Sequence, residues 1–568
     1  MICYKKIFFL IAISLLFVKG IGLVEFSYTR LLSVKQREVG RKRIPYRKNE
    51  FLESLRNFID KNIQGMGDKQ FYKPKKKPKY KFVRHKKKTI DLIKKNKIIC
   101  SENNPSFGLY FLPFNKRVEI NGGNISEPIQ NLDLESNLSN YSAFQIVISA
   151  YEKIRDIKVS NSSGKINFYI GEYIDIRKSL FSRDVVTIQD PLIPMVSDDK
   201  LNFKTYRPSF AIESNKSVPI WVEVRTEEGI GTFSEIIVEA KNETGKITKY
   251  NVPLKIRQKK NKQSVKSIYP FFSYNHKNTL RYYNNDILVK KNYSRNMEFI
   301  CSYGLYPVSL YPKMNDVKRD GFISQWVKLK QKGASVFILR YINEQTFFLL
   351  KDSLPYREEF IASLKKQENF LSEINILSNS YIYMFDELPE YFNERLNFTT
   401  SLLKENGIKS KLISTALNPS NLNLLDFHCP LLNKENKKFN HEKWAYICCV
   451  SPKEENLLLE SSLNAIQKLH EKLIKNNISH FLYYALNNWK GNIYVDRKNY
   501  KPYWKLYQSE YEEISKGNKW PGISWIPYSA TRCKLYGGDG YLIYPGNNGE
   551  FWPSARLINF CINFSTIK

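Results

Sequence analysis

Histidine is scarce in this sequence, and the spacings that usually bind metal ions are missing. The chain of 568 residues holds six histidines, and it contains neither an HExxH nor a CxxC motif. Zinc sites in proteins are commonly built from histidine and cysteine pairs at such spacings. We therefore expect no bound metal ion and no other cofactor.

Long apolar runs are also missing, except at the N-terminus. There, Lys5 and Lys6 precede an apolar run over residues 7–18. Because a membrane-spanning helix needs about 20 apolar residues, we interpret residues 1–22 as a signal peptide, with a membrane anchor as the alternative. We expect no transmembrane span after cleavage, and a secreted or lumenal protein of the secretory pathway. Sequons for N-glycosylation, such as those that begin at Asn124, Asn161, Asn242, Asn397 and Asn477, agree with that location.

Acidic residues are too few to balance the basic ones, and the net charge is +34. Most of the excess lies near the N-terminus, because residues 1–100 carry 27 Lys and Arg against 7 Asp and Glu. We expect residues 23–99 to form a disordered, basic, low-complexity tail. This tail is either a solvated linker or an arm that binds anionic lipid, glycan or a sorting partner. Since most of the excess charge lies in one tail, we expect no nucleic acid partner.

Seven cysteines follow the signal peptide. In an oxidising compartment they could form up to three disulfides with one cysteine left over, and the sequence does not give the pairing. We expect the adjacent Cys448 and Cys449 to pack inside the folded domain, with a vicinal disulfide as the alternative.

Short alternating apolar and polar runs dominate residues 100–265, and turn residues separate them. Examples are AFQIVISAY at 143–151 and VPIWVEVRT at 218–226. This rhythm is typical of antiparallel strands, so we predict an N-terminal β-sandwich domain. The polar stretch at 257–266 marks its end.

Compact apolar runs separated by helical patterns dominate residues 266–568. Strands that alternate with helices indicate a (β/α)8 TIM barrel, so we predict a multidomain chain in which this barrel follows the sandwich. The expected strands are 268–274, 299–310, 335–341, 381–387, 411–417, 424–430, 444–450 and 479–489.

The fourth expected strand ends in Asp386-Glu387, where a barrel of this kind has its active site. Glycoside hydrolysis requires an acid that protonates the leaving oxygen and a group that stabilises the charge on the anomeric carbon; two carboxylates normally serve. Adjacent residues of a strand point to opposite faces, so these two can converge only where the strand becomes a loop. Leu388-Pro389 predicts such a break.

Two carboxylates this close suit a mechanism in which the 2-acetamido oxygen of the substrate is the nucleophile. Asp386 would accept the acetamido N–H, and Glu387 would act first as acid and then as base. The structural alternative is that both residues cap the next helix, because Asp is common at N-caps and Glu in first turns.

Several segments resemble glycoside hydrolase family 123, and they occur in the order found in that family. They are DPLIP at 190–194, YIYMFDELPE at 381–390, WAYICC at 444–449, FLYYALNNW at 481–489, GDGYLIYPG at 538–546 and PSARL at 553–557. The likeness covers about residues 140–557. It implies a β-sandwich on a (β/α)8 barrel and a retaining, substrate-assisted exo-β-N-acetylgalactosaminidase. The Asp-Glu pair of the family carries over to Asp386 and Glu387.

The expected partner is a glycan with a terminal N-acetylhexosamine. For the substrate pocket we predict Trp489, Tyr484, Tyr446 and Tyr536. The chain also departs from the family, since Gly537 replaces the tryptophan that commonly precedes GDG and little sequence follows PSARL. The alternative function is therefore an inactive glycan-binding or structural secreted protein on the same scaffold.

Overall fold

The computed structural model describes most of the chain after residue 98, all within one compact unit, residues 78–568. The described ranges are 99–100, 105–118, 133–136, 141–161, 166–176, 186–195, 212–225, 232–258, 268–283, 285–312, 320–417, 419, 424–432, 442–448, 457–488, 540–546 and 549–564. The expected signal peptide, most of the basic tail, Trp489, Tyr536 and Gly537 lie outside them.

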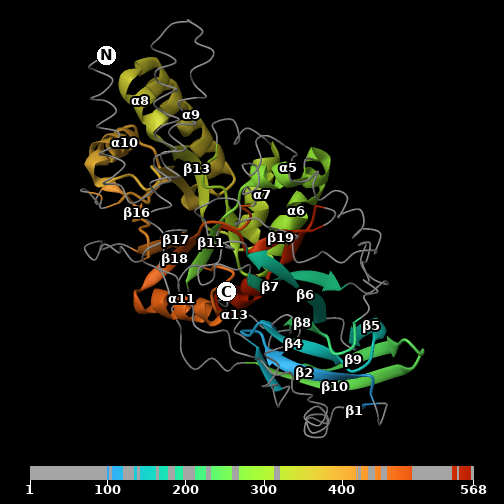
Figure 1. Cartoon of the computed structure of the whole chain (residues 1–568). Coiled ribbons are helices and arrows are strands. Elements are labelled where there is room, and N and C mark those ends of the chain that lie inside the picture. The colour runs from blue at the N-terminus through green and yellow to red at the C-terminus, as the bar shows by residue number, and fades with distance from the viewer. Residues whose placement is uncertain are drawn as a thin grey trace, which may run out of the picture. The chain divides into compact units, whose positions relative to one another are not determined.

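The N-terminal part is strand-rich and contains two five-stranded sheets (Figure 1). One sheet has the order β1 (Ile99–Cys100), β10 (Ile247–Gln258), β9 (Thr232–Asn242), β5 (Ile154–Asn161), with β3 (Asp133–Ser136) also on β10. The other has the order β2 (Phe107–Pro113), β4 (Tyr141–Ala150), β8 (Ser217–Arg225), β6 (Ile166–Ile176), β7 (Val186–Met195). Only the β3–β10 pair is parallel.

The two sheets share one core, to which alternate residues of each strand contribute. Ile236 and Val238 of β9 are buried, while the residues between and beside them are half-buried. Strand β4 is buried along almost its whole length, because Phe144 packs against the other sheet while Tyr141 packs into the core of the C-terminal part. An alternating pattern thus indicates that only one face of the strand is covered. The absence of alternation in β4 indicates that both faces of this strand are covered.

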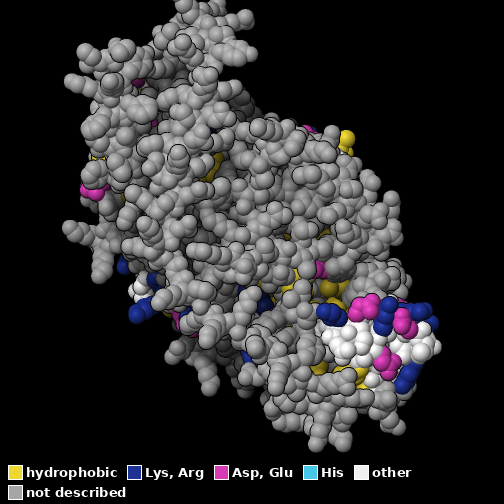
Figure 2. All heavy atoms as spheres, in the orientation of Figure 1, with side chains coloured by type: hydrophobic (Ala, Val, Ile, Leu, Met, Phe, Trp, Pro, Cys, Tyr) yellow, Lys and Arg dark blue, Asp and Glu magenta, His cyan; other side chains and the backbone are white. Residues whose placement is uncertain are grey.

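The exposed edge of this region carries charges of both signs. Lys153 pairs with Glu213 at 3.5 Å and with Glu243 at 3.2 Å, and Arg155 lies 4.0 Å from Glu243. Figure 2 shows basic and acidic side chains intermingled over these strands. The described surface here is mixed in charge, unlike the composition of the tail.

The C-terminal part contains eight parallel strands in two four-stranded sheets. Their bounds are β11 (Tyr269–Ser273), β12 (Tyr306–Val308), β13 (Phe337–Ile342), β14 (Ser380–Met384), β15 (Lys411–Ser414), β16 (Phe427–His428), β17 (Lys443–Ile447) and β18 (Ile478–Tyr483). The sheet orders are β12-β11-β18-β17 and β13-β14-β15-β16, so the last strand pairs with the first. A single bridge between Leu431 and Tyr446 connects the segment after β16 to β17. No ladder joins β12 to β13 within the described residues.

Helices separate most of these strands. They are α5 (His276–Tyr283), α6 (Asp286–Ser302), α7 (Asp320–Gln331), α8 (Glu344–Asp352), α9 (Leu354–Glu373), α10 (Asn393–Glu405), α11 (Asn464–Lys475) and α13 (Ala555–Phe564), with 3-10 turns η2 (Leu377–Asn379) and η3 (Glu390–Phe392) and a hairpin of β19 (Ile543–Pro545) and β20 (Phe551–Pro553). One expectation is wrong in part: residues 299–302 end α6 rather than begin a strand. Among the described residues, no helix lies between β15 and β17.

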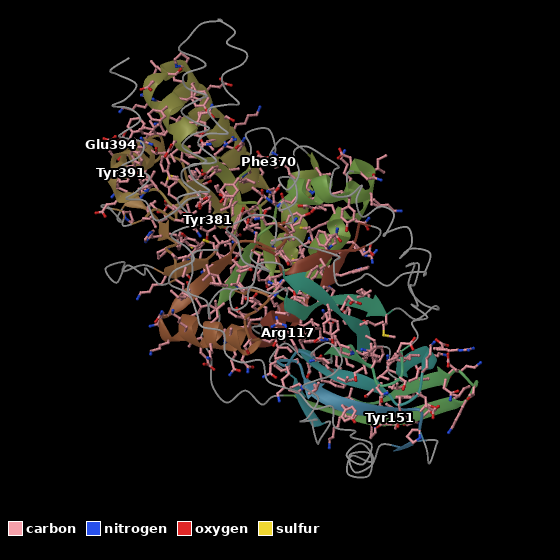
Figure 3. The ribbon with its side chains drawn as sticks, viewed as in Figure 1. Arg117, Tyr151, Phe370, Tyr381, Tyr391 and Glu394 are labelled. Carbon is pink, nitrogen blue, oxygen red and sulfur yellow. The ribbon has the colours of Figure 1, made fainter. Side chains whose placement is uncertain are left out.

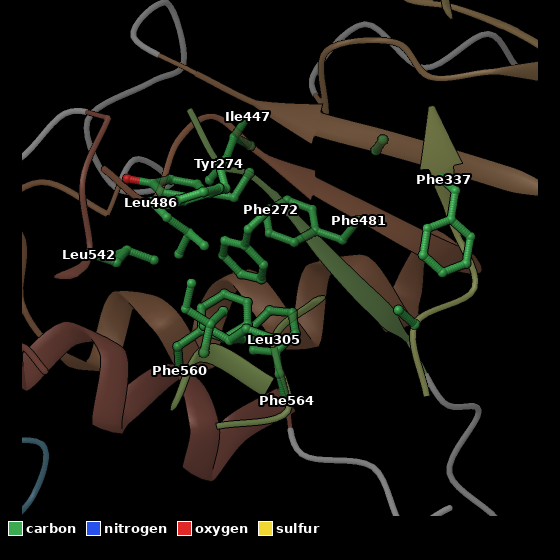
Figure 4. Close-up of a cluster of buried hydrophobic side chains, with 14 of the residues drawn as sticks. Phe272, Tyr274, Leu305, Phe337, Ile447, Phe481, Leu486, Leu542, Phe560 and Phe564 are labelled. Carbon is green, nitrogen blue, oxygen red and sulfur yellow. The ribbon is translucent and has the colours of Figure 1, made fainter. Parts of the chain in front are cut away.

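Alternate residues of the parallel strands enter two different cores. Phe271, Tyr381 and Trp444 belong to a cluster enclosed by the strands, whereas their neighbours Phe272 and Ile382 pack outward against the helices. Figure 4 shows the outer core, where side chains of β11 and β18 meet those of α13. Since side chains alternate along a strand, this separation fixes which residues can reach the space inside the sheets.

Buried ionic groups join the strand-rich part to the C-terminal part. Arg556 of α13 bonds both carboxylate oxygens of Asp190 of β7, at 2.9–3.1 Å, and Tyr544 donates to the same carboxylate at 2.7 Å. Arg117, labelled in Figure 3, lies 3.7 Å from Asp190 and donates to the carbonyl oxygen of Ser461. Asp190 and Arg556 are at most 1% exposed. The segments DPLIP and PSARL therefore meet in this junction.

Among the described cysteines, Cys429, Cys448 and Cys561 are buried and Cys301 is half-buried. The side chain of Cys448 packs among the strands as expected, and Cys449 lies outside the described residues. None of the described helices combines the length and hydropathy required to traverse a bilayer.

Candidate active site

The C-terminal ends of several parallel strands bring polar side chains together. Glu387 and Asp386 follow β14, Thr415 follows β15, and Tyr446 lies near the end of β17. Tyr311 follows β12 by three residues. Because parallel strands end at the same edge of a sheet, residues distant in sequence meet here, which is where α/β barrels and open α/β sheets place their chemistry.

Left-handed backbone at two residues shapes the turn that carries the carboxylates. Strand β14 ends at Met384, and both Phe385 and Glu387 have φ of +50°. Residues other than glycine rarely adopt this region. The turn is held by a bond from Phe385 N–H to the Ile342 carbonyl oxygen at 2.9 Å. The strand thus ends before Asp386, which lies three residues before Pro389. The two adjacent carboxylates therefore need not point to opposite faces of the sheet.

Asp386 is exposed, and hydroxyl groups fix its carboxylate. Tyr311 donates to Oδ2 at 2.7 Å, and Tyr383 donates to Oδ1 at 2.5 Å. Thr415 Oγ1 lies 3.3 Å from Oδ1. Three neutral donors around one carboxylate suit an ionised side chain that keeps one orientation.

Glu387 is half-buried, and one of its oxygens is occupied by protein groups. Tyr446 donates to Oε1 at 2.5 Å, and the thiol of Cys448 lies 3.7 Å from the same oxygen. The backbone N–H of Glu387 donates to Thr415 Oγ1 at 3.0 Å. No bond to Oε2 is found among the described residues, which leaves that oxygen as the one able to hold a transferable proton.

Burial keeps the tyrosine hydroxyls protonated. Desolvation, followed by the charge of Asp386, raises the pKa of Tyr383 and of Tyr311 well above the usual value. Desolvation and then the charge of Glu387 raise the pKa of Tyr446, to which Asp386 also contributes. All three remain donors at neutral pH, and both carboxylates act on the Tyr446 hydroxyl.

The pair does not cap the following helix. The turn η3 begins after Pro389, and α10 begins after Phe392, and neither has a side-chain capping bond. Figure 3 shows Tyr391 and Glu394 beyond the turn, on the segment that leads away from β14. The structural alternative considered for Asp386 and Glu387 is thus excluded.

The other predicted pocket residues have different outcomes. Tyr484 follows β18, is half-buried, and interacts electrostatically with Tyr311. Tyr446 reaches Glu387 itself. Whether Tyr484 and Tyr446 bind a sugar is not tested by the structure. Trp489 and Tyr536 lie outside the described residues. Within the described ranges, no group of three or more His, Cys, Asp or Glu side chains is placed to hold a metal ion.

Sequence reasoning missed Tyr311, Tyr383 and Thr415. A signal for them exists, because each lies in an expected strand or directly after one. Rings of Tyr311 and Tyr383 also pack with Tyr341, with centroids 4.8 and 5.4 Å from it. These tyrosines form an aromatic wall beside Asp386.

Comparison with known proteins agrees with this geometry. Residues 322–563 match the family model described as the catalytic domain of glycoside hydrolase 123. A solved family 123 glycoside hydrolase from Clostridium perfringens, studied for glycolipid glycan hydrolysis, has a TM-score of 0.56 at 13% identity, covering 81% of this chain and 87% of that one. A Bacteroides ovatus GH5 xyloglucanase gives a TM-score of 0.25 at 9% identity, covering 76% and 98%. No curated protein matches the sequence.

The fold and the carboxylate pair, together with the family match, define the C-terminal part as a glycoside hydrolase domain. The match begins within α7, so it covers the strands from β13 onward and the whole Asp386-Glu387 turn. Residues 322–563 are thus similar to the catalytic domain of glycoside hydrolase family 123.

Proposed function

We propose that this chain is a retaining, substrate-assisted exo-β-N-acetylgalactosaminidase. The catalytic domain would be a (β/α)8 barrel over residues 266–568, the strand-rich part a β-sandwich over 100–265, and residues 1–22 a signal that delivers the protein to the secretory pathway. The observation that carries the activity is the turn in which Asp386 and Glu387 share Thr415 as a partner.

The two carboxylates have environments that suit different tasks. Asp386 accepts bonds from three hydroxyls and is suited to remain ionised while it accepts the acetamido N–H of the substrate. That contact turns the acetamido oxygen toward the anomeric carbon and stabilises the positive charge of the oxazolinium formed by its attack. A fixed carboxylate is required, because the attacking oxygen must be aligned before the bond breaks.

Glu387 then supplies the proton transfers. Tyr446 occupies Oε1, so Oε2 carries the proton that passes to the glycosidic oxygen as the C–O bond breaks. The resulting carboxylate takes a proton from water, and the water oxygen adds to the anomeric carbon as the oxazolinium ring opens. Two displacements at one carbon retain its configuration, and Glu387 regains its proton.

Aromatic residues would bind the sugar. The wall of Tyr311 and Tyr341 lies beside Asp386, and aromatic rings pack well against the apolar faces of sugars. Tyr484, Trp489 and Tyr536 would complete the pocket, with Tyr446 contributing its hydroxyl. The Clostridium perfringens relative is described as acting on glycolipid glycans, and glycolipids with a terminal N-acetylgalactosamine are therefore the first natural substrates to test.

The test is hydrolysis of an aryl β-N-acetylgalactosaminide, compared with the matching β-N-acetylglucosaminide and with β-galactoside, which lacks the acetamido group. We expect turnover of the first, slower turnover of the second and none of the third. Glu387→Gln and Asp386→Asn should each lower kcat by about 100- to 10,000-fold, because each removes a group used in the transition state. NMR of the first-formed sugar should show the β-anomer.

Hydrolysis of the β-galactoside at a similar rate would exclude participation of the acetamido group. A well-folded protein that binds N-acetylgalactosamine but hydrolyses none of these substrates would instead support the alternative of an inactive glycan-binding protein on this scaffold. An α-anomer as first product would exclude the retaining mechanism.

A further inference from the structure

Thr415 contacts both halves of the carboxylate turn. Its Oγ1 accepts the backbone N–H of Glu387 at 3.0 Å and lies 3.3 Å from Asp386 Oδ1. The same oxygen lies 2.8 Å from the Tyr383 hydroxyl. Thr415 is 2% exposed, so water does not replace these bonds when they are lost.

The hydrogen atoms can be assigned from the number available. Tyr383 has one hydroxyl hydrogen, and its short bond to the Asp386 carboxylate uses it. The bond between Tyr383 and Thr415 must therefore use the threonine hydrogen, which is shared with Asp386 Oδ1. The lone pairs of Thr415 Oγ1 remain free to accept the N–H of Glu387. One hydroxyl thus serves as donor on the Asp386 side and acceptor on the Glu387 side.

We propose that Thr415 is a positioning residue that sets the geometry of Asp386 and Glu387 relative to each other. It does not touch the reacting atoms. The inference rests on the proposed function but adds a residue from a different strand, β15, as the group that holds the turn.

The physical reason is the backbone conformation on either side of Asp386. Both Phe385 and Glu387 have positive φ, and such conformations persist only where surrounding groups hold them. Ser414, the residue before Thr415, also donates to the Phe385 carbonyl oxygen at 3.3 Å. The end of β15 therefore fixes the turn from both sides, and the hydroxyl of Thr415 is the part that reaches the carboxylates.

The experiment compares Thr415→Val, Thr415→Ser and Thr400→Val in the full chain. Valine keeps the shape and removes the hydroxyl, serine keeps the hydroxyl, and Thr400 is a matched control. Thr400 is also fully buried, but its hydroxyl bonds only to carbonyl oxygens of its own helix. Each variant is assayed on N-acetylgalactosaminides with a good aryl and a poor alkyl leaving group, and its thermal unfolding midpoint is measured.

We expect Thr415→Val to lower kcat by about 100-fold on both substrates with little change in KM, since displacement of catalytic groups by about 1 Å has effects of this size. Loss on both substrates is expected because Asp386 acts whatever the leaving group. Thr415→Ser and Thr400→Val should stay near wild type. Equal losses in Thr415→Val and Thr400→Val, or no rescue by serine, would overturn the inference.

A crystal structure of Thr415→Val provides a second measurement that does not depend on activity. Rearrangement of the turn, with Asp386 leaving Tyr383, would support the positioning role even if the wild-type chain hydrolyses none of the sugars tested. An unchanged turn with positive φ at Phe385 and Glu387 would overturn it. Failure of the wild type on every substrate counts against the proposed function alone.

Discussion

At the scale of single residues, the catalytic turn holds its carboxylates at an energetic cost. Positive φ at Phe385 and Glu387 costs on the order of 1–3 kcal/mol each. Bonds donated by Tyr311 and Tyr383 to Asp386, and the bond that Thr415 accepts from the Glu387 N–H, offset that cost. The strain is therefore localised at the turn where, in the proposed mechanism, two adjacent carboxylates act on the same sugar.

Replacement of Tyr446 by phenylalanine should affect proton donation by Glu387 more than it affects the other functions of the site. The change removes the 2.5 Å bond to Glu387 Oε1. Glu387 becomes a carboxylate as it gives up its proton, and a bond to a charged group is worth about 1.5–3 kcal/mol. We expect kcat to fall by about 10- to 100-fold on the alkyl glycoside, with a smaller loss on the aryl glycoside. The smaller loss is expected because an aryl leaving group needs less help from an acid. Steady-state kinetics on both substrates measure this.

Tyr269→Phe is the matched control for that experiment. Its hydroxyl accepts the N–H of Ser335 at 2.6 Å and lies at the start of β11, at the opposite end of the strands. It should leave kcat unchanged. Equal losses on both substrates for Tyr446→Phe would mean that Tyr446 binds the acetamido group rather than positioning Glu387.

At this scale, the sequence predicts the acidic pair and Tyr446, but not the other partners of the pair. Asp386 and Glu387 can be found because they end an apolar run in a recognisable motif. Tyr311 and Thr415 reach them only because strands β12 and β15 end at the same edge, and that depends on strand register. The left-handed conformation has no sequence signal either, since neither Phe385 nor Glu387 is a glycine.

At the scale of elements, apolar runs predicted all eight parallel strands because buried strands are short and continuous in hydrophobicity. The error at residues 299–302 has a physical cause. Helix α6 and strand β12 are separated by a short turn at 303–305, and the end of the helix is as apolar as the strand. Periodicity alone does not distinguish the two in such a short stretch.

A second feature at this scale is a bulge in β6 that buries a carboxyl group. The register between β6 and β7 shifts between Gly171 and Tyr173, so Glu172 lies in the irregular position. Glu172 is 6% exposed and accepts the Tyr173 N–H at 3.0 Å. Burial raises the pKa of Glu172 to about 8, which means that the folded chain holds this group protonated at pH values where the unfolded chain ionises it.

Stability should therefore fall as pH rises. The pKa of Glu172 is higher in the folded chain than in the unfolded chain. Its contribution to the free energy of unfolding is therefore complete below about pH 4.5 and is lost as the pH rises to about 8. Glu172→Gln keeps the shape and cannot ionise, so it should lose less stability than wild type between pH 5 and pH 8. Urea unfolding of both proteins at the two pH values measures the difference, and identical pH dependence would contradict the expectation.

At the scale of the whole molecule, the strand-rich and C-terminal parts are joined through a buried charge cluster. Asp190 is bonded by Arg556 and Tyr544, and Arg117 lies near it. The sequence marks these residues only as parts of DPLIP and PSARL. It does not show that two such segments meet, because their contact spans 366 positions in the chain.

Replacing only Arg556 in this cluster should lower the free energy of unfolding more than replacing both Arg556 and Asp190. Arg556→Met leaves the Asp190 carboxylate buried without its main partner, and we expect unfolding to become easier by about 3–5 kcal/mol. Asp190→Asn combined with Arg556→Met removes the charge as well, so the double variant should be more stable than Arg556→Met. Urea denaturation of both variants measures this, and a double variant less stable than Arg556→Met would show that the ion pair is not the source of the effect.

The same junction determines when the N-terminal strands can finish folding during synthesis. Asp190 leaves the ribosome hundreds of residues before Arg556. Until Arg556 has also emerged, the carboxylate of Asp190 in β7 lacks the guanidinium group of α13. Completion of β7 against the C-terminal part must therefore wait for α13. A nascent chain arrested before residue 555 should leave the surface of β7 around Asp190 accessible to proteases. Release of α13 should protect that surface.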